Sequence, residues 1–277
     1  MAYYNQQQQG YQPQGNNPYQ QGAPGWNVPP AGPPPNMAST PHYAEGGIPK
    51  HEFGFSDQTI RAAFIRKVFF IVAIMLGVVA FMSAVPFMHE PTMMFVRHNP
   101  ALYFMSYGTF LVVYIALMCC ESVRRSFPSN IICTAILTLA IGYMTMMICS
   151  MYQASAVVMC LTITTLCCGA IIIFSSQTKY DLTSMMGIVF IASMVLMIFG
   201  LVAMIGVLAF KVRVLYTIYA GLAALLFMFY LAIDVQMIMG GRKYEISPED
   251  HIFASIQIFL DIIYIFWMLL SLFGSNK

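Results

Sequence analysis

The sequence has few charged residues for its length, because Asp, Glu, Lys and Arg make up only 9% of its 277 positions while apolar residues make up 59%. A soluble domain needs more polar surface than this composition supplies, so we expect the chain to lie in a lipid bilayer. The formal net charge is only +2, and no long basic run is present. Nucleic acid is therefore excluded as an expected partner.

Cysteine is present without the spacing of a metal site or a disulfide framework. All seven cysteines fall inside apolar stretches and lack the paired spacing of zinc ligands or of secreted disulfide domains. We interpret them as small buried hydrophobic residues. No bound cofactor is expected.

Residues 1–55 form a segment of low complexity. The run Gln6-Gln7-Gln8-Gln9 and the proline cluster at positions 29–35 leave too few aliphatic residues to offset the entropy of ordering. We predict a disordered tail. The proline cluster resembles a polyproline II ligand for an SH3 or WW module, although a plain solvated tail accounts for the same residues.

From residue 56 to residue 277 the pattern predicts an all-α membrane domain. Apolar runs near 20 residues in length recur, and each can cross a hydrocarbon core of about 30 Å as a helix. The seven expected spans are Val68–Met88, Ala101–Cys120, Asn130–Met151, Ala154–Phe174, Met185–Phe210, Val214–Met239 and Ile252–Phe273. Tyr152 and Gln153 alone separate the third span from the fourth, so one long buried segment is an alternative there.

Basic residues near the ends of the spans differ between the two faces of the expected bundle. One face collects Lys50, Arg61, Arg66, Lys67, Arg124, Arg125, Lys179, Arg242 and Lys243. The other face has Arg97, Lys211, Arg213 and Lys277. Because basic residues are retained in the cytosol, we expect a cytosolic N-terminal tail and, after seven crossings, a lumenal or extracellular C-terminus.

Two aspartates interrupt the last two apolar spans. Asp234 lies in Phe-Tyr-Leu-Ala-Ile-Asp-Val-Gln and Asp261 in Ile-Phe-Leu-Asp-Ile-Ile-Tyr, so neither belongs to a loop. A carboxylate at membrane depth costs at least a few kcal/mol unless it is protonated, paired or hydrated, and such residues usually mark ion or proton pathways. The alternative is a structural hydrogen bond between two helices.

The two aspartates are expected to lie close together. Asp234 is about 8 Å from the cytosolic end of its helix, and Asp261 is about 14 Å from the start of the next, antiparallel helix. Two carboxyl groups in one dry site cannot both ionise cheaply, so the pair should titrate as a unit near neutral pH. Tyr230, Gln257 and Tyr264 lie three or four residues away on the same helix faces and are candidates for supporting hydrogen bonds.

Arg124 and Arg125 are the candidate positive partners for these aspartates. Both follow the second span at its cytosolic end, where an arginine side chain could hold ionised aspartates as a latch. The simpler interpretation is that they are charges of a short cytosolic loop, which the orientation of the chain requires in any case.

Several segments together resemble the transmembrane Bax-inhibitor-motif family, in particular its lifeguard branch. They are Arg61–Phe69, Arg124-Arg125 with Pro128, Phe174–Asp181 and the two aspartate segments. The resemblance covers about residue 61 to the C-terminus.

The resemblance implies a seven-helix fold with a central seventh helix. It further implies a calcium leak pathway in intracellular membranes, either endoplasmic reticulum or Golgi with the plasma membrane as an alternative, and an anti-apoptotic role. Asp234 and Asp261 would then form a pH-sensing, calcium-attracting pair, and Arg124 or Arg125 would hold the closed state. Carboxylate oxygens are suitable ligands for calcium, which would be the transported ion.

Three other functions share features with this sequence. A receptor of the rhodopsin type has an Asn-Pro-x-x-Tyr string in its seventh helix, whereas here Asn99-Pro100-Ala101-Leu102-Tyr103 precedes the second span. An intramembrane aspartyl protease has Gly-x-Gly before its second aspartate, whereas Asp261 follows Ile-Phe-Leu. We therefore expect no enzyme activity. A non-conducting regulator that binds other channels or death receptors remains open as an alternative.

Overall fold

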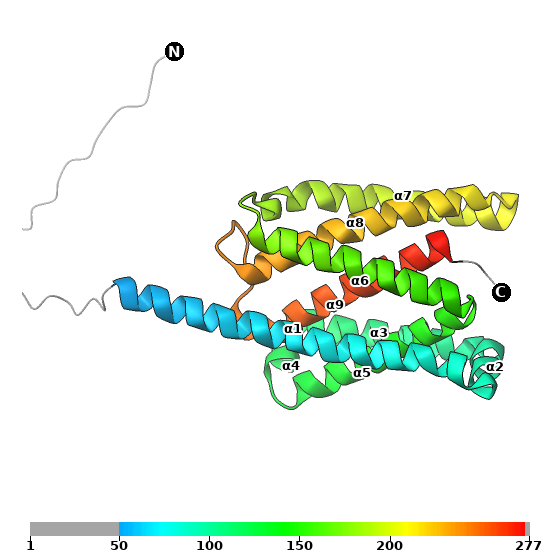
Figure 1. Cartoon of the computed structure of the whole chain (residues 1–277), viewed down its shortest axis with the longest axis horizontal. Helices are drawn as coiled ribbons and strands as arrows, with labels where there is room; N and C mark the ends of the chain where they lie inside the picture. Colours follow the sequence, from blue (N-terminus) through cyan, green and yellow to red (C-terminus); the bar gives the residue numbers. More distant parts are fainter. Residues whose placement is uncertain (1–49, 275–277) are drawn as a thin grey trace, which may run out of the picture. The chain divides into compact units, whose positions relative to one another are not determined.

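The computed structural model describes the backbone of residues 50–274 and the side chains of residues 57–274. This part of the chain is a bundle of helices that run along a common direction (Figure 1). The α-helices are α1 (Lys50–Met88), α2 (Glu90–His98), α3 (Pro100–Cys119), α4 (Glu121–Arg125), α5 (Ser129–Ser150), α6 (Ala154–Gln177), α7 (Met186–Phe210), α8 (Arg213–Met239) and α9 (His251–Phe273). Two 3₁₀ turns, η1 (Leu182–Met185) and η2 (Pro248–Asp250), precede α7 and α9.

Seven of these helices, α1, α3 and α5 to α9, are long and apolar enough to cross a membrane. Their bounds agree with the predicted spans to within a few residues, except that α1 begins well before Val68. A turn at Met151–Gln153 separates α5 from α6, so the alternative of one long segment there is wrong. The expected all-α, seven-span class is confirmed. Residues 1–49 of the predicted tail, with the proline cluster, lie outside the described residues, whereas residues 50–55, which were expected in the tail, form the first turns of α1.

Two short helices, α2 and α4, were not predicted. Helix α2 has Glu90 and Pro91 in its first turn and Arg97 and His98 in its last, an arrangement that suits the helix dipole. Helix α4 likewise begins with Glu121 and ends with basic residues. Both are far shorter than a membrane span, so a search for apolar runs near 20 residues could not detect them.

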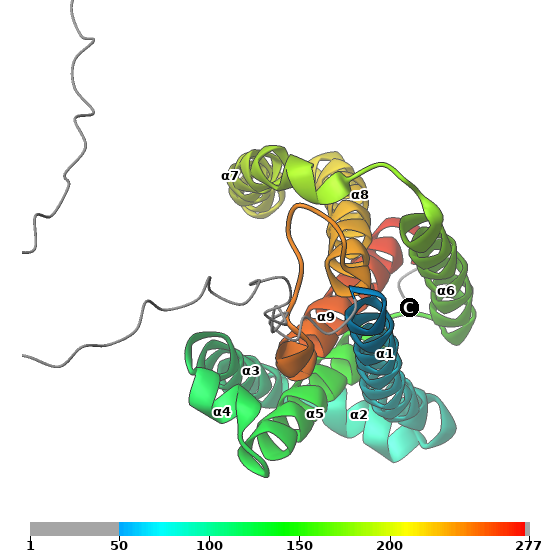
Figure 2. The same cartoon turned by 90° about the vertical axis from the view of Figure 1, so that its left-hand side faces the viewer.

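Helix α9 is the central element of the described bundle. In its most apolar stretch 61% of the residues are buried, against 11% in each of α3 and α7. It contacts α1, α5, α6 and α8, and the view along the bundle shows it between these helices (Figure 2). The expectation of a central seventh span is therefore confirmed.

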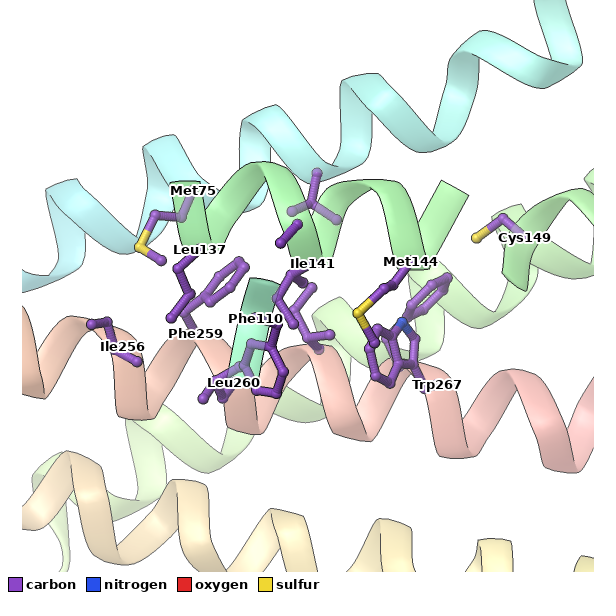
Figure 3. Close-up of a cluster of buried hydrophobic side chains, with 14 of the residues drawn as sticks. Met75, Phe110, Leu137, Ile141, Met144, Cys149, Ile256, Phe259, Leu260 and Trp267 are labelled. Carbon is purple, nitrogen blue, oxygen red and sulfur yellow. The ribbon is translucent and has the colours of Figure 1, made fainter. Parts of the chain in front are cut away.

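The largest apolar cluster lies where α5 and α1 pack against α9 (Figure 3). Leu137 and Ile141 of α5 and Phe259 of α9 are fully buried within this cluster. On the same interface the Trp267 indole nitrogen donates a 3.1 Å hydrogen bond to Thr145 Oγ1. Because lipid tails are as apolar as these side chains, close packing and such hydrogen bonds hold the helices together here.

We predict that Phe259→Ala lowers the free energy of unfolding by about 3 kcal/mol, because it leaves a cavity beside the central helix. Thermal unfolding of the purified protein in detergent measures the change. Phe70→Ala is the matched control, since Phe70 on α1 is 65% exposed. Equal losses in the two variants would contradict the central role of α9 packing.

Candidate functional site

Asp234 on α8 and Asp261 on α9 lie together inside the bundle. Their exposed fractions are only 4% and 7%, and the two carboxyl groups are within hydrogen-bonding reach of each other. We call them the aspartate pair. The structure thus brings together the two aspartates that the sequence interpretation placed side by side.

A hydrogen bond between two carboxyl groups requires a proton on one of them. In a site this dry, two negative charges in contact would repel each other without solvent screening, so the pair is suited to hold a single shared proton. Asp261 Oδ2 is buried and has no hydrogen-bond partner in the described part of the chain. The pair therefore has unused capacity to bind a proton or a cation.

Tyr264 is a predicted supporting residue that interacts with the pair. It interacts electrostatically with Asp261, and its ring stacks on Phe227 of α8 at 4.8 Å between centroids. Tyr230 instead lines a 630 Å³ cavity between α7 and α8. Gln257 is partly exposed and, among the described residues, has no hydrogen-bond partner. Tyr264 thus remains a candidate for the site, and the support expected from Tyr230 and Gln257 stays a prediction.

Two residues that were not predicted lie near the pair. Tyr114 of α3 lies within electrostatic reach of both aspartates, and Cys168 of α6 lies within reach of Asp261. Helices α3 and α6 are thus added to α8 and α9 around the site. Neither residue carries a sequence signal that would distinguish it from the other tyrosines and cysteines of the spans.

Arg124 and Arg125 bind Asp250, the residue before α9, and do not contact the aspartate pair. Arg124 Nε donates to Asp250 Oδ1 at 3.0 Å, and Arg125 donates to both Asp250 oxygens at 2.9 and 2.8 Å. This hydrogen bond to Asp250 is also the largest cause of a raised pKa of Arg125. The arginines therefore fasten the start of α9 to α4.

The direct contact between these arginines and the pair, which the sequence interpretation proposed, is not formed in this structure. Asp250 is eleven residues before Asp261, which corresponds to about 16 Å along a helix and exceeds the reach of an arginine side chain at α4. A latch made by Arg124 or Arg125 could act on the pair only through the position of α9. In that indirect form the latch remains a prediction.

The loop between α8 and α9 (residues 240–247, the α8–α9 loop) is held against α1. Arg61 donates a 2.7 Å hydrogen bond to the carbonyl of Ile246 and forms a 3.2 Å ion pair with Glu245. Gly240 has a φ of 75°, and a Cβ atom there would lie 2.9 Å from the Arg61 side chain. The Arg61 side chain could shift away from a Cβ atom, so it is the backbone conformation, with a φ of 75° and a ψ of −179°, that requires glycine at this position.

The segment between α6 and η1 is held by α8 and by the same loop. Gln236 is fully buried. Its side chain accepts from Leu182 N at 2.8 Å and donates to the Tyr180 carbonyl at 2.9 Å. Asp181 accepts hydrogen bonds from the Thr183 hydroxyl and from Lys243 N, and these bonds lower its pKa. Gln236, two residues after Asp234, thus secures the end of α8 next to the pair.

The segments on which the family resemblance rests meet at this end of the bundle. Arg61 contacts the α8–α9 loop, Asp181 contacts Lys243 of that loop, and the two arginines contact Asp250 just after it. Sequence reasoning did not find the roles of Gln236 and Asp250, because a single glutamine or a loop aspartate carries no pattern of its own.

The aspartate pair offers oxygen ligands only. Carboxylate oxygens suit calcium, but among residues 57–274 no three His, Cys, Asp or Glu side chains converge as a metal site would require. Two carboxyl groups without a third protein ligand would hold a cation only weakly, since calcium takes about six to eight oxygen ligands.

These features define a multi-pass α-helical membrane protein with an acidic site buried between its last two spans. The family model described as "Inhibitor of apoptosis-promoting Bax1" matches residues 61–277, and the chain belongs to this family. The chain is 41% identical to human Protein lifeguard 3 over 223 residues, which are 80% of this chain and 72% of the relative. The mouse Protein lifeguard 3 is 42% identical over the same shares of the two chains.

A plant relative has a lower sequence identity but matches a segment of the same length. Protein LIFEGUARD 4 of Arabidopsis thaliana is 25% identical over 223 residues, which cover 79% of this chain and 87% of the relative. The predicted resemblance to the lifeguard branch is therefore confirmed.

We predict that Gln236→Leu lowers the free energy of unfolding by about 2–4 kcal/mol, since it leaves Leu182 N and the Tyr180 carbonyl without their partner. Thermal unfolding in detergent measures this loss. Gln257→Leu serves as the control and should change stability by less than about 0.5 kcal/mol, because that side chain is partly exposed and unpaired. If Gln236→Leu left the free energy of unfolding unchanged, the contacts of Gln236 with Leu182 and Tyr180 would contribute little to stability.

Proposed function

We propose that this protein is a pH-modulated calcium leak pathway of intracellular membranes, of the endoplasmic reticulum or Golgi, with an anti-apoptotic role. The observation that carries the proposal is the buried contact between Asp234 and Asp261 on neighbouring spans. Membership of a family described by the inhibition of an apoptosis-promoting protein supports the cellular role.

The charges at the two ends of the bundle support an orientation. The end with the α8–α9 loop has eight basic residues in the described part, Arg61, Arg66, Lys67, Arg124, Arg125, Lys179, Arg242 and Lys243, and the other end has Arg97, Lys211 and Arg213. By the positive-inside rule the α8–α9 loop faces the cytosol, and Phe273, the last residue of α9, lies at the lumenal side. The aspartate pair then belongs to the cytosolic half of the membrane.

Proton and calcium would compete for the same oxygen atoms. With its shared proton the pair carries one negative charge, and loss of that proton adds a second charge that attracts a divalent cation more strongly. Calcium flux should therefore change with pH in the range where the pair titrates. Protonation of the pair would also alter the contact between α8 and α9. A change of pH would thus change the packing of these two helices along the pathway.

We predict that purified protein in liposomes passes calcium with a pH dependence that Asp234→Asn and Asp261→Asn each abolish. Flux is measured with a calcium indicator inside the vesicles at mildly acidic and mildly alkaline pH. Asp57→Asn is the control, because Asp57 is exposed at the start of α1 and should leave the pH dependence intact. Unchanged flux and pH dependence in both pair variants would refute the proposal.

The contacts at Asp250 lead to a separate prediction about the latch. Asp250→Asn weakens the hold of Arg124 and Arg125 on the start of α9, so basal calcium flux should rise several-fold at neutral pH. Arg124→Gln should act in the same direction. Glu249→Gln is the control, since the Glu249 side chain is 74% exposed and makes only a 3.3 Å pair with Arg125. A folded Asp250→Asn protein with unaltered flux would rule out a latch at this position.

A further inference from the structure

The side of α9 toward α3 and α8 carries a row of tyrosine side chains. Tyr103, Tyr107 and Tyr114 recur on α3 at positions i, i+4 and i+11, which places them on one face of that helix. Tyr264 of α9 and Tyr216 of α8 complete the set, which we call the tyrosine row. Helix α3 packs on α5, and α8 packs on α6, α7 and α9, so α3 and α8 flank α9 without packing on each other (Figure 2).

The tyrosine row leads from the aspartate pair to the opposite end of the bundle. Tyr114 lies within electrostatic reach of both aspartates, and Tyr264 lies within reach of Asp261. Tyr264 also interacts with the three tyrosines of α3. At the far end, Tyr103 lies near Tyr216.

The last contact of the row reaches the end of α9. The Tyr216 hydroxyl donates a 3.3 Å hydrogen bond to Ser271 Oγ, close to the final residue of that helix. From Asp261 to Ser271 the distance along the helix is about 15 Å. The row therefore covers the half of the membrane that the aspartate pair does not occupy.

Most hydroxyl groups of the row have no protein partner. In the described part of the chain, no hydrogen bond is made by the hydroxyls of Tyr103, Tyr107, Tyr114 or Tyr264, and none of the four is among the polar atoms sealed inside the protein. Lipid tails cannot accept a hydrogen bond, so a hydroxyl exposed to them would remain unsatisfied. Tyr103 and Tyr107 lie within the first eight residues of α3, where water at the end of the bundle can satisfy them. Tyr114 and Tyr264 lie deeper in their helices, and there water inside the bundle is the partner that would satisfy their hydroxyls.

The opposite side of α9 is chemically different. There a 560 Å³ cavity among α1, α5, α6 and α9 is lined mainly by apolar side chains such as Val79, Ile172 and Phe266. Four of its lining residues have hydroxyl groups: Thr145, Thr164 and Thr165 donate to carbonyls of their own helices, and Ser83 Oγ is buried without a partner in the described part of the chain. A cation would therefore meet mostly hydrocarbon on this side.

We propose that the tyrosine row lines the hydrated route by which a cation moves between the aspartate pair and the end of the bundle at Ser271. This inference rests on the calcium pathway proposed above and assigns its second half. Phenolic oxygens are neutral and hard, and the aromatic faces also attract cations. A row of such groups stabilises a partly hydrated cation without trapping it.

The first test removes hydroxyls without changing the shape of the side chains. In liposomes, Tyr114→Phe combined with Tyr264→Phe should lower calcium flux at least about fivefold, the factor that corresponds to one lost hydrogen bond. Tyr143→Phe is the matched control, because Tyr143 on α5 is not part of the row and its hydroxyl is buried without a partner in the described part of the chain. If the parent protein conducts and the double variant conducts equally, the inference is overturned while the proposed function stands.

The second test detects water along the row independently of flux. A small charged thiol reagent should modify Tyr107→Cys in membranes, beyond the labelling of the native cysteines in the parent protein. It should leave Phe266→Cys unmodified, since Phe266 faces the apolar cavity on the other side of α9. Equal labelling of both positions, or labelling of neither, overturns the inference. If the parent protein passes no calcium, the proposed function fails, and this labelling alone decides whether the row is hydrated.

Discussion

Hydrocarbon cannot solvate a carboxylate, so two aspartates at membrane depth need a proton, a partner or contact with water. In this protein Asp234 and Asp261 meet this requirement by lying against each other between α8 and α9. Two carboxyl groups this close together in a dry site favour a shared proton, and they can meet only if α9 passes beside α8. The central position of the last span and the chemistry of the site are therefore linked.

The end of the bundle near the pair is held by polar contacts. Arg61 fixes the α8–α9 loop, Gln236 fixes the segment before α7, and Asp250 fixes the start of α9 to α4. The far half differs, because in the described part of the chain four of the five hydroxyls of the tyrosine row have no protein partner. One end is thus tied by ion pairs and hydrogen bonds, while the other half has unsatisfied polar groups that require water. This asymmetry fits a pathway that is restrained at one end.

The helices and the aspartate pair could be predicted because each has a signal in the linear sequence. Apolar runs mark the spans, and a charge inside such a run is conspicuous. Helix α2 could not be found in this way, since its nine residues are too few to form a run. The partner of the two arginines was also missed, because Asp250 lies in a loop far away in the sequence. Arg124 and Arg125 form ion pairs with Asp250 and not with the aspartate pair.

The central claim, that the pair holds one proton for which calcium competes, is tested most directly by counting the protons released when calcium binds. Calorimetry of the purified protein in buffers of different ionisation enthalpy provides this number. We predict a net release of up to one proton per calcium at neutral pH, and none in the Asp234→Asn/Asp261→Asn double variant. Calcium binding without proton release, or equal release from the double variant, would contradict the account.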